Sequence, residues 1–377
     1  MGRCREGVVY GAARGVSTAL VFNSSRGPRL PDLSRPPMSR TGKERAFGMT
    51  NLVTIFGGSG FVGRYIARRM AKAGWRVRVA VRRPNEAIFV RTYGVVGQVE
   101  PILANIRDDA SVRAAIHGAE VVINCVGILA ETGKNRFDAV QAEGAGRVAR
   151  IAAEEGAARF VQISAIGADA ESKSAYARTK AAGEQAVLEA FPQAVILRPS
   201  IVFGPEDQFF NRFAAMTRTS PFLPVVGAET RFQPVYVDDV AEAAEKAALG
   251  TAKPGIYELG GPDIRDFRSL MEMMLTVIRR RRFILSVPFW AANVMGGGFD
   301  LLQKVTFGLF QNGLLTRDQV RNLRNDNVVN PDRMTFSDLG IEPTPLEAIL
   351  DEYLWPYRRD GQYAEMKDSA ADLRGQE

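Results

Sequence analysis

The stretch NLVTIFGGSGFVGRYIARRMAKAGWRVRVAV, residues 51–81, decides the fold. Its first six letters predict an apolar strand, GGSGFVG predicts a tight turn, the next eleven letters predict a helix ending at Gly74, and WRVRVAV predicts a second strand. Strand, helix and strand in this order form a βαβ unit. Gly57, Gly60 and Gly63 lie at the turn, where backbone N–H groups at the positive end of a helix hold a dinucleotide pyrophosphate. The stretch therefore predicts a dinucleotide-binding site.

The end of the second predicted strand bears on which dinucleotide binds. In NAD-binding proteins an acidic residue at this position binds the adenosine ribose. Here the strand ends in VAVRRP, which places Arg82 and Arg83 there. Guanidinium groups suit a 2′-phosphate, so the sequence favours NADP(H) over NAD(H). Phe61 and Val62, at the helix start, are further predicted cofactor residues, and Arg64 is either another phosphate contact or a solvent-exposed helix residue.

Three further apolar runs extend the sheet. QVEPIL, AEVVINCVGIL and ARFVQIS predict the third, fourth and fifth strands. Ligands of an open parallel sheet bind beyond the carboxyl ends of its strands. Candidate cofactor-lining residues at such ends are Asn105, Ile106, Asn124, Val126, Gly127 and, in LRPSIVFGPED, Pro199. The predicted fold class is α/β, with a doubly wound parallel Rossmann sheet and a smaller C-terminal lobe.

A second group of motifs follows the glycine turn. NCVG, ISAIGA, Tyr176-x-x-x-Lys180, LRPSIVFGPED and QPVYVDDVAEA occur within residues 51–262, in the order used by the extended, atypical short-chain dehydrogenase/reductases, which are NAD-dependent epimerase/dehydratase-like. The chain resembles that superfamily. The resemblance implies that Ser164 orients a substrate carbonyl, that Tyr176 is the general acid/base and that Lys180 contacts the nicotinamide ribose.

The spacing of the Tyr176 and Lys180 pair has a chemical reason. Residues four apart share one face of a helix, so the Lys180 ammonium is predicted to lower the pKa of the Tyr176 phenol from about 10. Only eleven residues, AIGADAESKSA, separate Ser164 from Tyr176, fewer than in typical extended enzymes of the superfamily. Whether the protein turns over a substrate therefore stays open. The alternative to a binding role is an NADP-dependent reductase, epimerase or dehydratase acting on a sugar nucleotide or another small carbonyl compound.

A narrower resemblance spans about residues 51–355. IFGGSGFVGRY, AVRRP, AEGAGRVARIA, FGPEDQFFNRFAAM and, near the C-terminus, GLLTRDQVRNLRNDNVV and LGIEPTPLEAILDEYL are similar to the nucleotide-binding accessory subunits of respiratory complex I in α-proteobacteria and mitochondria. This implies a tightly held NADPH with a structural role, complex I subunits as partners and a place near the membrane. We expect a peripheral protein on the cytoplasmic face of a bacterial inner membrane; the alternatives are the mitochondrial matrix and the soluble cytoplasm.

Composition excludes several other classes. Of the formal net charge of +7, residues 1–48 hold nine Lys/Arg against three acidic residues, so the rest of the chain is nearly balanced and no nucleic-acid partner is expected. Cys4 and Cys125 are too few for a disulfide framework. The single histidine, His117, is predicted to end a helix rather than to bind a metal. No run of eighteen apolar residues predicts a membrane-spanning helix.

Four segments are expected along the chain. Residues 1–48 form a disordered or wrongly assigned extension, 49–262 the Rossmann domain, with some segments after 200 joining the small lobe, 263–357 the C-terminal lobe, and 358–377 a loose tail.

The predicted C-terminal lobe is rich in aromatic and aliphatic residues beside the run Arg279–Arg282. Its apolar residues are Phe289, Trp290, Val294, Met295, Phe299, Leu302, Phe307 and Phe310. They are either the core of the lobe or an exposed surface for a protein or bilayer partner, with the arginines facing phospholipid head groups or acidic subunits. The sequence pattern fits both interpretations equally.

Overall fold

The computed structural model describes residues 51–294, 297, 317–359 and 361–363. The predicted extension 1–48, most of the predicted tail, and Met295, Phe299, Leu302, Phe307 and Phe310 lie outside the described residues. Residues Gly48–Glu377 form one compact unit. The predicted boundary near residue 262, between the Rossmann domain and the C-terminal lobe, stays a prediction.

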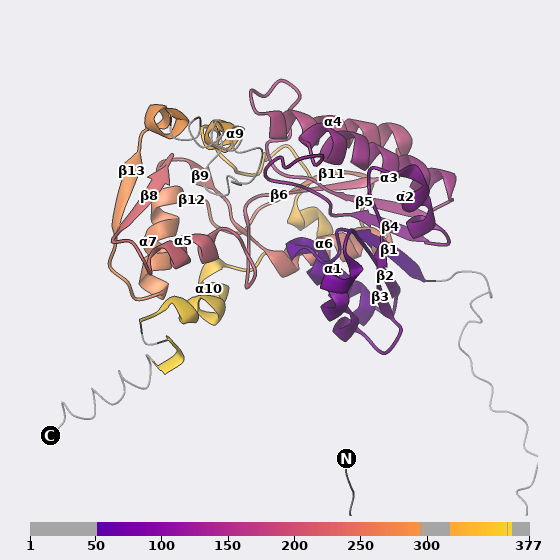
Figure 1. The fold of residues 1–377 in the computed structure, drawn as a ribbon, viewed down its shortest axis with the longest axis horizontal. Helices are drawn as coiled ribbons and strands as arrows, with labels where there is room; N and C mark the ends of the chain where they lie inside the picture. Colours follow the sequence, from indigo (N-terminus) through magenta and orange to yellow (C-terminus); the bar gives the residue numbers. More distant parts are fainter. Residues whose placement is uncertain (1–50, 295–296, 298–316, 360, 364–377) are drawn as a thin grey trace, which may run out of the picture. The chain divides into compact units, whose positions relative to one another are not determined.

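A seven-stranded parallel sheet in the order β11-β6-β5-β4-β1-β2-β3 forms the centre of this unit (Figure 1). Its strands are β1 (Leu52–Phe56), β2 (Arg76–Val81), β3 (Val99–Leu103), β4 (Val121–Asn124), β5 (Arg159–Ile163), β6 (Val195–Pro199) and β11 (Gly255–Leu259). From β1 the chain adds β2 and β3 on one side and β4, β5 and β6 on the other, so the order reverses between β1 and β4. The predicted doubly wound Rossmann sheet is confirmed.

Helices cover both faces of the sheet, and its central strands β1 and β4 are therefore buried on both sides. These helices are α1 (Phe61–Lys72), α2 (Asp109–Ile116), α3 (Glu143–Glu154), α4 (Ala175–Ala190) and α6 (Val237–Leu249). Side chains of α1 and α6 share a core with Val53 and Ile55, whereas side chains of α2 and α3 share another with Leu52 and Phe56. Alternate residues of β1 thus face opposite cores, as the two-residue period of a strand requires.

The helix boundaries follow local capping signals. The Asp108 side chain accepts a hydrogen bond from Ala110 N and begins α2, and His117 ends it, as predicted. Ser174 caps α4 by accepting from Ala177 N, so Tyr176 lies in the first turn of that helix, also as predicted. Both starts match the preference of Asp and Ser for the N-cap position.

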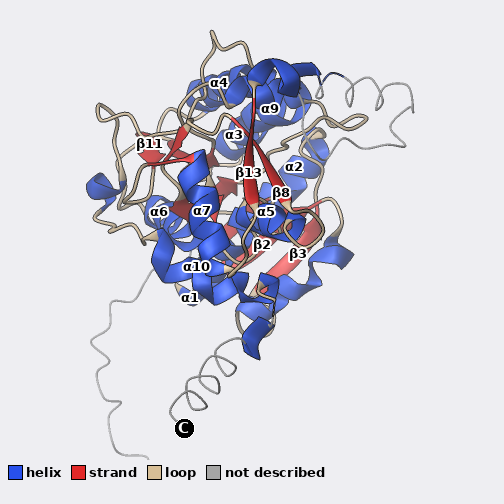
Figure 2. Ribbon diagram, turned by 90° about the vertical axis from the view of Figure 1, so that its left-hand side faces the viewer, coloured by secondary structure: helices blue, strands red, loops and turns tan. Residues whose placement is uncertain are grey.

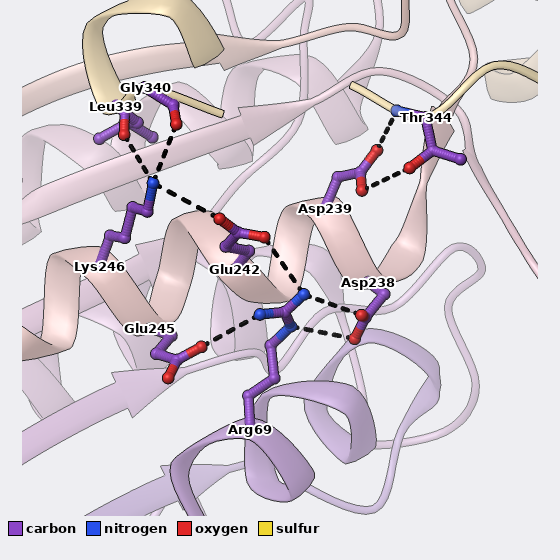
Figure 3. A network of polar contacts seen from close by, with 9 residues as sticks. All are labelled: Arg69, Asp238, Asp239, Glu242, Glu245, Lys246, Leu339, Gly340 and Thr344. Atoms are coloured by element: carbon purple, nitrogen blue, oxygen red, sulfur yellow. Dashed lines mark hydrogen bonds and ion pairs between the residues drawn. The ribbon is translucent and has the colours of Figure 1, made fainter. Parts of the chain in front are cut away.

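A charged network ties α1 to α6 (Figure 3). The Arg69 guanidinium donates to Asp238 at 2.8 and 3.0 Å, to Glu245 at 3.2 Å and to Glu242 at 3.3 Å. A planar guanidinium with several N–H donors suits this role, because one side chain reaches carboxylates on successive turns of α6.

Residues 336–344 return to the same helix α6. Lys246 Nζ donates to the carbonyl oxygens of Leu339 (2.9 Å) and Gly340 (3.1 Å), and Asp239 accepts from both N and Oγ1 of Thr344 (Figure 3). The 3-10 helix Phe336–Leu339 contributes Phe336 to the same core as α1 and α6. The C-terminal part is therefore bound to the sheet as well as to its own lobe.

A separate apolar core lies in the segments between and after the last strands of the sheet. The elements around it are β7 (Val202–Phe203), α5 (Phe210–Met216), β8 (Phe222–Val226), β9 (Arg231–Phe232), β10 (Val235–Tyr236), β12 (Arg265–Asp266), α7 (Phe267–Val277), β13 (Phe283–Val287) and α10 (Leu346–Leu354). Leu270 and Met274 of α7 are buried in it, and Met273 and Val277 pack against it.

The described residues contain no helix that is both long and apolar enough to cross a membrane. Within the same residues, no group of three or more His, Cys, Asp and Glu side chains gathers closely enough to hold a metal ion.

Candidate functional site

The glycine turn between β1 and α1 presents the start of a helix without a side-chain cap. Gly60 occupies the N-cap position, no side chain caps α1, and its first turn holds no acidic residue. Gly57 has φ +72°, a conformation that glycine adopts readily. The first N–H groups of α1 and its positive dipole end therefore suit an anionic ligand such as a pyrophosphate.

Gly63 keeps α1 close to this turn. A Cβ at residue 63 would lie 2.4 Å from Gly57 O and 2.8 Å from the Gly58 Cα, both backbone atoms that cannot turn aside. The third glycine is thus required by helix packing rather than by direct contact with a ligand, in accordance with its role in dinucleotide folds.

A cavity of about 690 Å³ opens beyond the carboxyl ends of β1, β2, β3 and β4. Its lining residues are Phe56, Gly57, Ser59, Gly60, Ala80, Val81, Arg82, Arg83, Glu86, Ala104, Asn105, Ile106, Arg107, Cys125, Val126, Gly127, Ile128, Asn135 and Val140. Eight of the predicted cofactor residues are among them: Gly57, Gly60, Arg82, Arg83, Asn105, Ile106, Val126 and Gly127. Its place at the reversal of strand order is where such folds bind dinucleotides.

Arg82 and Arg83 differ in what they contact. Arg83 Nη1 forms an ion pair with Glu86 Oε1 at 3.0 Å, whereas the exposed Arg82 side chain forms no hydrogen bond or ion pair with the described part of the chain. Of the two arginines at the end of β2, Arg82 is therefore the one whose guanidinium is available to a ligand phosphate.

Other predicted cofactor residues lie outside the cavity lining. Arg64 donates to the carbonyl oxygens of Gly60 and Ser59 and pairs with Glu206 at 3.2 Å. Its guanidinium therefore stabilises the glycine turn. Asn124 is fully buried, donates to Gln162 Oε1 and accepts from Val126 N. Phe61, Val62, Gly63, Pro199, Ser164, Tyr176 and Lys180 also do not line it.

Of Ser164, Tyr176 and Lys180, Lys180 lies nearest a residue that lines this cavity. Ser164 follows β5 directly, and its buried Oγ has no hydrogen-bond partner among the described residues. Lys180 Nζ lies 5.9 Å from the centre of the Tyr176 ring, and a Cβ on Gly127 would lie 3.4 Å from the same Nζ. Because Gly127 lines the cavity, the Lys180 ammonium lies directly behind a lining residue. The unpartnered Ser164 hydroxyl is a donor that a bound ligand can satisfy.

The predicted effect of Lys180 on Tyr176 is wrong for the protein without a ligand. Burial raises the pKa of Tyr176 to about 12, because the surroundings disfavour a phenolate. Burial also lowers the pKa of Lys180 to about 8, against the opposing charges of Glu184 and Cys125. The spacing of the two residues indicated their shared helix face, whereas the direction of the Tyr176 shift depends on burial, which the spacing does not show.

Sequence reasoning missed part of the lining. Ser59 and Arg107 follow predicted strands and could have been included by the rule used for their neighbours. Asn135 and Val140 could not, because they lie on and after the connection that follows β4, and no local pattern indicates that it folds over the cavity.

A second cavity, of about 720 Å³, lies beside the N-terminus of α4. Its lining residues are Asp169, Ser172, Lys173, Ser174, Asn293, Val294, Arg317, Arg321, Arg324 and Asn325. Four basic side chains against one carboxylate favour an anionic ligand. Arg231 does not line this cavity and pairs with Asp326 at 2.7 Å.

Comparison with protein families identifies the sheet-forming part. The model described as "NAD dependent epimerase/dehydratase family" matches residues 53–260. The solved structure of the Bordetella bronchiseptica enzyme WbmH in complex with NAD+ superposes with a TM-score of 0.60, at 17% identity, over 82% of this chain and 99% of that chain. At this identity the likeness concerns the fold alone.

Two curated relatives are more similar in sequence. The Arabidopsis thaliana protein "NADH dehydrogenase [ubiquinone] 1 alpha subcomplex subunit 9, mitochondrial" is 37% identical over 317 residues, which cover 82% of this chain and 79% of that protein. The Caulobacter vibrioides "Ceramide reductase" is 36% identical over 214 residues, which cover 57% of this chain and 65% of that protein. The first match is too long to be confined to residues 53–260 and extends into other parts of the chain.

Proposed function

The chain belongs to the NAD dependent epimerase/dehydratase family and, within it, to the family of the subunit 9 proteins of NADH dehydrogenase, and on that basis we propose that it is an accessory subunit of respiratory complex I that holds NADPH. The length of the match with the Arabidopsis subunit carries the proposal, because it includes more than the dinucleotide-binding part that many unrelated activities share. The proposed location is the cytoplasmic face of a bacterial inner membrane, with residues 49–262 holding the cofactor and 263–357 docking.

The cofactor part of the proposal rests on the cavity beside the glycine turn. The uncapped start of α1, the unengaged Arg82 and the Lys180 ammonium behind the cavity lining suit the pyrophosphate, the 2′-phosphate and the nicotinamide ribose respectively. When bound, NADPH would supply a hydride donor. The short Ser164–Tyr176 connection favours a holding role over turnover.

A second candidate is an NADP-dependent reductase. The observation in its favour is the intact set of Ser164, Tyr176 and Lys180, with a buried Ser164 Oγ that lacks a partner among the described residues, together with the similarity to the Ceramide reductase. In such a reaction Ser164 would orient the substrate carbonyl and Tyr176 Oη would donate a proton to its oxygen, while the carbon receives the hydride. The basic second cavity would accommodate an anionic part of the substrate.

Co-purification from membranes separates the two candidates. A C-terminally tagged protein carrying Tyr176→Phe should recover complex I subunits from detergent-solubilised membranes as fully as the unsubstituted protein, since the phenol hydroxyl is not needed to hold a partner. Subunit recovery by mass spectrometry and NADPH content are the measurements. A monodisperse protein recovered without complex I subunits contradicts the accessory role, and loss of one metabolite conversion in the Phe variant supports the reductase.

The proposed contact with the membrane uses an exposed apolar face. Phe283 and Leu285 of β13 align with Phe222 and Pro224 of β8, and Figure 2 shows the two strands side by side. Phe283 is 73% exposed and Trp290, in the helical residues that follow, is 72% exposed. Of the aromatic segment, Trp290 and Val294 are thus exposed, whereas Phe289 is partly buried and packs against Val226 and Val320, so each of the two interpretations holds for part of the described residues. We call Phe222, Phe283, Leu285, Trp290 and Val294, all exposed, the apolar face.

The charge around the apolar face suits anionic lipid. Residues 208–228 and 273–294 together contain six arginines and no acidic residue. Arg218 lies over the Tyr357 ring, and Arg280 contacts the same residue. Burial and the charges of Arg282, Arg218 and Arg359 lower the pKa of Arg280. Arg280 and Arg282 also donate to the carbonyl oxygens of Tyr357 and Thr217, which fixes them in the lobe. Aromatic residues beside a basic cluster are typical of membrane-surface contacts.

Trp290 allows this contact to be measured. Adding vesicles that contain anionic phosphatidylglycerol should shift tryptophan emission to the blue, because the exposed indole would leave water; Trp75 is only 7% exposed and should not respond, and Trp355, which is 37% exposed, is replaced by Phe in all samples. Trp290→Phe should remove the shift and Arg281→Glu should weaken binding, more strongly at low salt.

The matched control is Val96→Ser, which changes a fully exposed apolar residue far from the apolar face in sequence and should leave vesicle binding unchanged. Equal binding to uncharged phosphatidylcholine vesicles, or none to anionic ones, would assign the apolar face to a protein partner instead.

A further inference from the structure

Helix α4, which carries Tyr176 and Lys180, needs a residue from elsewhere in the chain to accept hydrogen bonds from the N–H groups of its first turn. The first N–H groups of a helix lack partners within the helix, and Ser174 Oγ accepts only from Ala177 N. The N–H groups of Ala175 and Tyr176 instead donate to Asp318, at 2.8 and 3.2 Å, and Ser174 Oγ donates to the same carboxylate at 2.7 Å. A side chain more than 140 positions away in the chain thus completes the first turn of α4.

We propose that residues 317–329, here called the strap, position the Tyr176 and Lys180 pair, with Asp318 as the positioning residue. The inference rests on the proposed NADPH site and concerns how that site is held. A carboxylate at the positive end of a helix is stabilised by the dipole as well as by hydrogen bonds, so Asp318 both satisfies the first turn and fixes where it begins.

The strap is attached at its other end to the strands that flank the site. Asn327 accepts from Ser200 Oγ through its carbonyl oxygen (3.0 Å) and its Oδ1 (2.6 Å), and Ser200 follows β6 directly. Asn327 N donates to Arg231 O, and Gln233 N donates to Asn327 O. Between these anchors, Thr230 Oγ1 donates to Leu323 O at 2.6 Å. The strap therefore joins the start of α4 to the ends of β6 and β9.

This attachment links two events thermodynamically. If the nicotinamide half of the cofactor binds only when Tyr176 and Lys180 are in place, the apparent affinity falls with the fraction of molecules in which the strap is attached. Binding of NADPH must then stabilise the strap by the same factor. Whatever holds the C-terminal lobe in its complex would reach the cofactor site through Asp318.

Asp318→Ala should weaken NADPH binding by up to about thirtyfold and by roughly fivefold for the typical cost of losing a helix cap. The same variant should bind 2′,5′-ADP, which occupies only the adenosine half at the glycine turn and Arg82, within about twofold of the unsubstituted protein. The NADPH affinity of Asp318→Asn, which retains one acceptor oxygen, should lie between those of Asp318→Ala and the unsubstituted protein. Nicotinamide fluorescence gives the NADPH affinity, and displacement of NADPH gives that of 2′,5′-ADP.

The matched control is Asp266→Ala. Asp266 is also a capping carboxylate, which accepts from Ser269 N at 2.7 Å and from Ser269 Oγ at 2.9 Å, but at the start of α7. Asp266→Ala should lower the free energy of unfolding about as much as Asp318→Ala does, and it should leave NADPH binding unchanged. Equal losses of NADPH and 2′,5′-ADP binding in Asp318→Ala, or no loss of either, overturn the inference.

Hydrogen exchange tests the strap without a cofactor. In nucleotide-free protein, Asp318→Ala should speed exchange of the amides of residues 175–177, and Asp266→Ala should not. Unchanged protection there contradicts the positioning role even if the protein binds no nucleotide. Failure of the unsubstituted protein to bind NADPH would instead overturn the proposed function, so the two failures are distinguishable.

Discussion

Arg198→Leu is expected to lower the free energy of unfolding by about 3–5 kcal/mol, the range for removing one partner of a buried ion pair. Arg198 donates to Glu184 at 2.6, 3.0 and 3.2 Å and to Glu258 at 3.2 Å. The side chains of all three residues are nearly buried, at 11%, 5% and 7% exposure. Removing the guanidinium leaves two carboxylates close together with no cation between them. Urea unfolding followed by circular dichroism measures the loss.

Arg150→Leu is the matched control for this variant. Arg150 also bridges two carboxylates, Asp109 and Glu154, but its side chain is 46% exposed. Exposed pairs contribute little because water screens them, and the loss should stay below about 1 kcal/mol. Similar losses in the two variants would show that burial of the Arg198 group does not matter.

The Arg198 group also affects the site. Glu184 lies on α4, eight residues after Tyr176 and four after Lys180, so Arg198 fastens the same face of α4 to β6. With Asp318 at its first turn, α4 is held at two points along its length. Unfolding and NADPH binding should therefore both respond to Arg198→Leu.

Arg82→Glu should weaken NADPH binding about thirtyfold or more and change NADH binding by less than about threefold. A charge-assisted contact with a phosphate is lost and a like charge takes its place, an effect of about 2–5 kcal/mol when a bound charge pair is broken. Arg82 is the arginine of choice because Arg83 is already paired with Glu86. Fluorescence titrations with both dinucleotides measure the two affinities.

Arg76→Glu provides the comparison. It reverses the same charge at the opposite end of β2, where the exposed Arg76 lies far along the strand from the cavity. Its affinities for both dinucleotides should equal those of the unsubstituted protein. Equal weakening of NADH and NADPH binding by Arg82→Glu would mean that residue 82 does not contact the 2′-phosphate.

The fold could be predicted because its signals are local. The apolar run of β1, the glycines of the turn and the period of α1 lie within residues 51–81, and the capping residues Asp108 and Ser174 stand directly before the helices they begin. Parallel strands joined by helices leave few topologies to choose from.

The site could be predicted only where it follows from strand ends. Gly57, Arg82, Asn105 and Gly127 line the cavity as expected, because each stands at or just after the end of a strand. Asp318 could not be predicted, since its role depends on the meeting of segments that are distant in the chain. The raised pKa of Tyr176 was missed for a related reason: it reflects how much protein surrounds the phenol.

The return of residues 336–344 to α6 has a consequence for synthesis on the ribosome. Phe336, Leu339 and Ile341 belong to the same core as β1 and α1, and Lys246 holds the turn that contains them. The first strands to emerge therefore lack part of their apolar cover until residues 336–341 have been made. Contacts between such distant parts form slowly, and apolar surface that is exposed meanwhile is prone to aggregate.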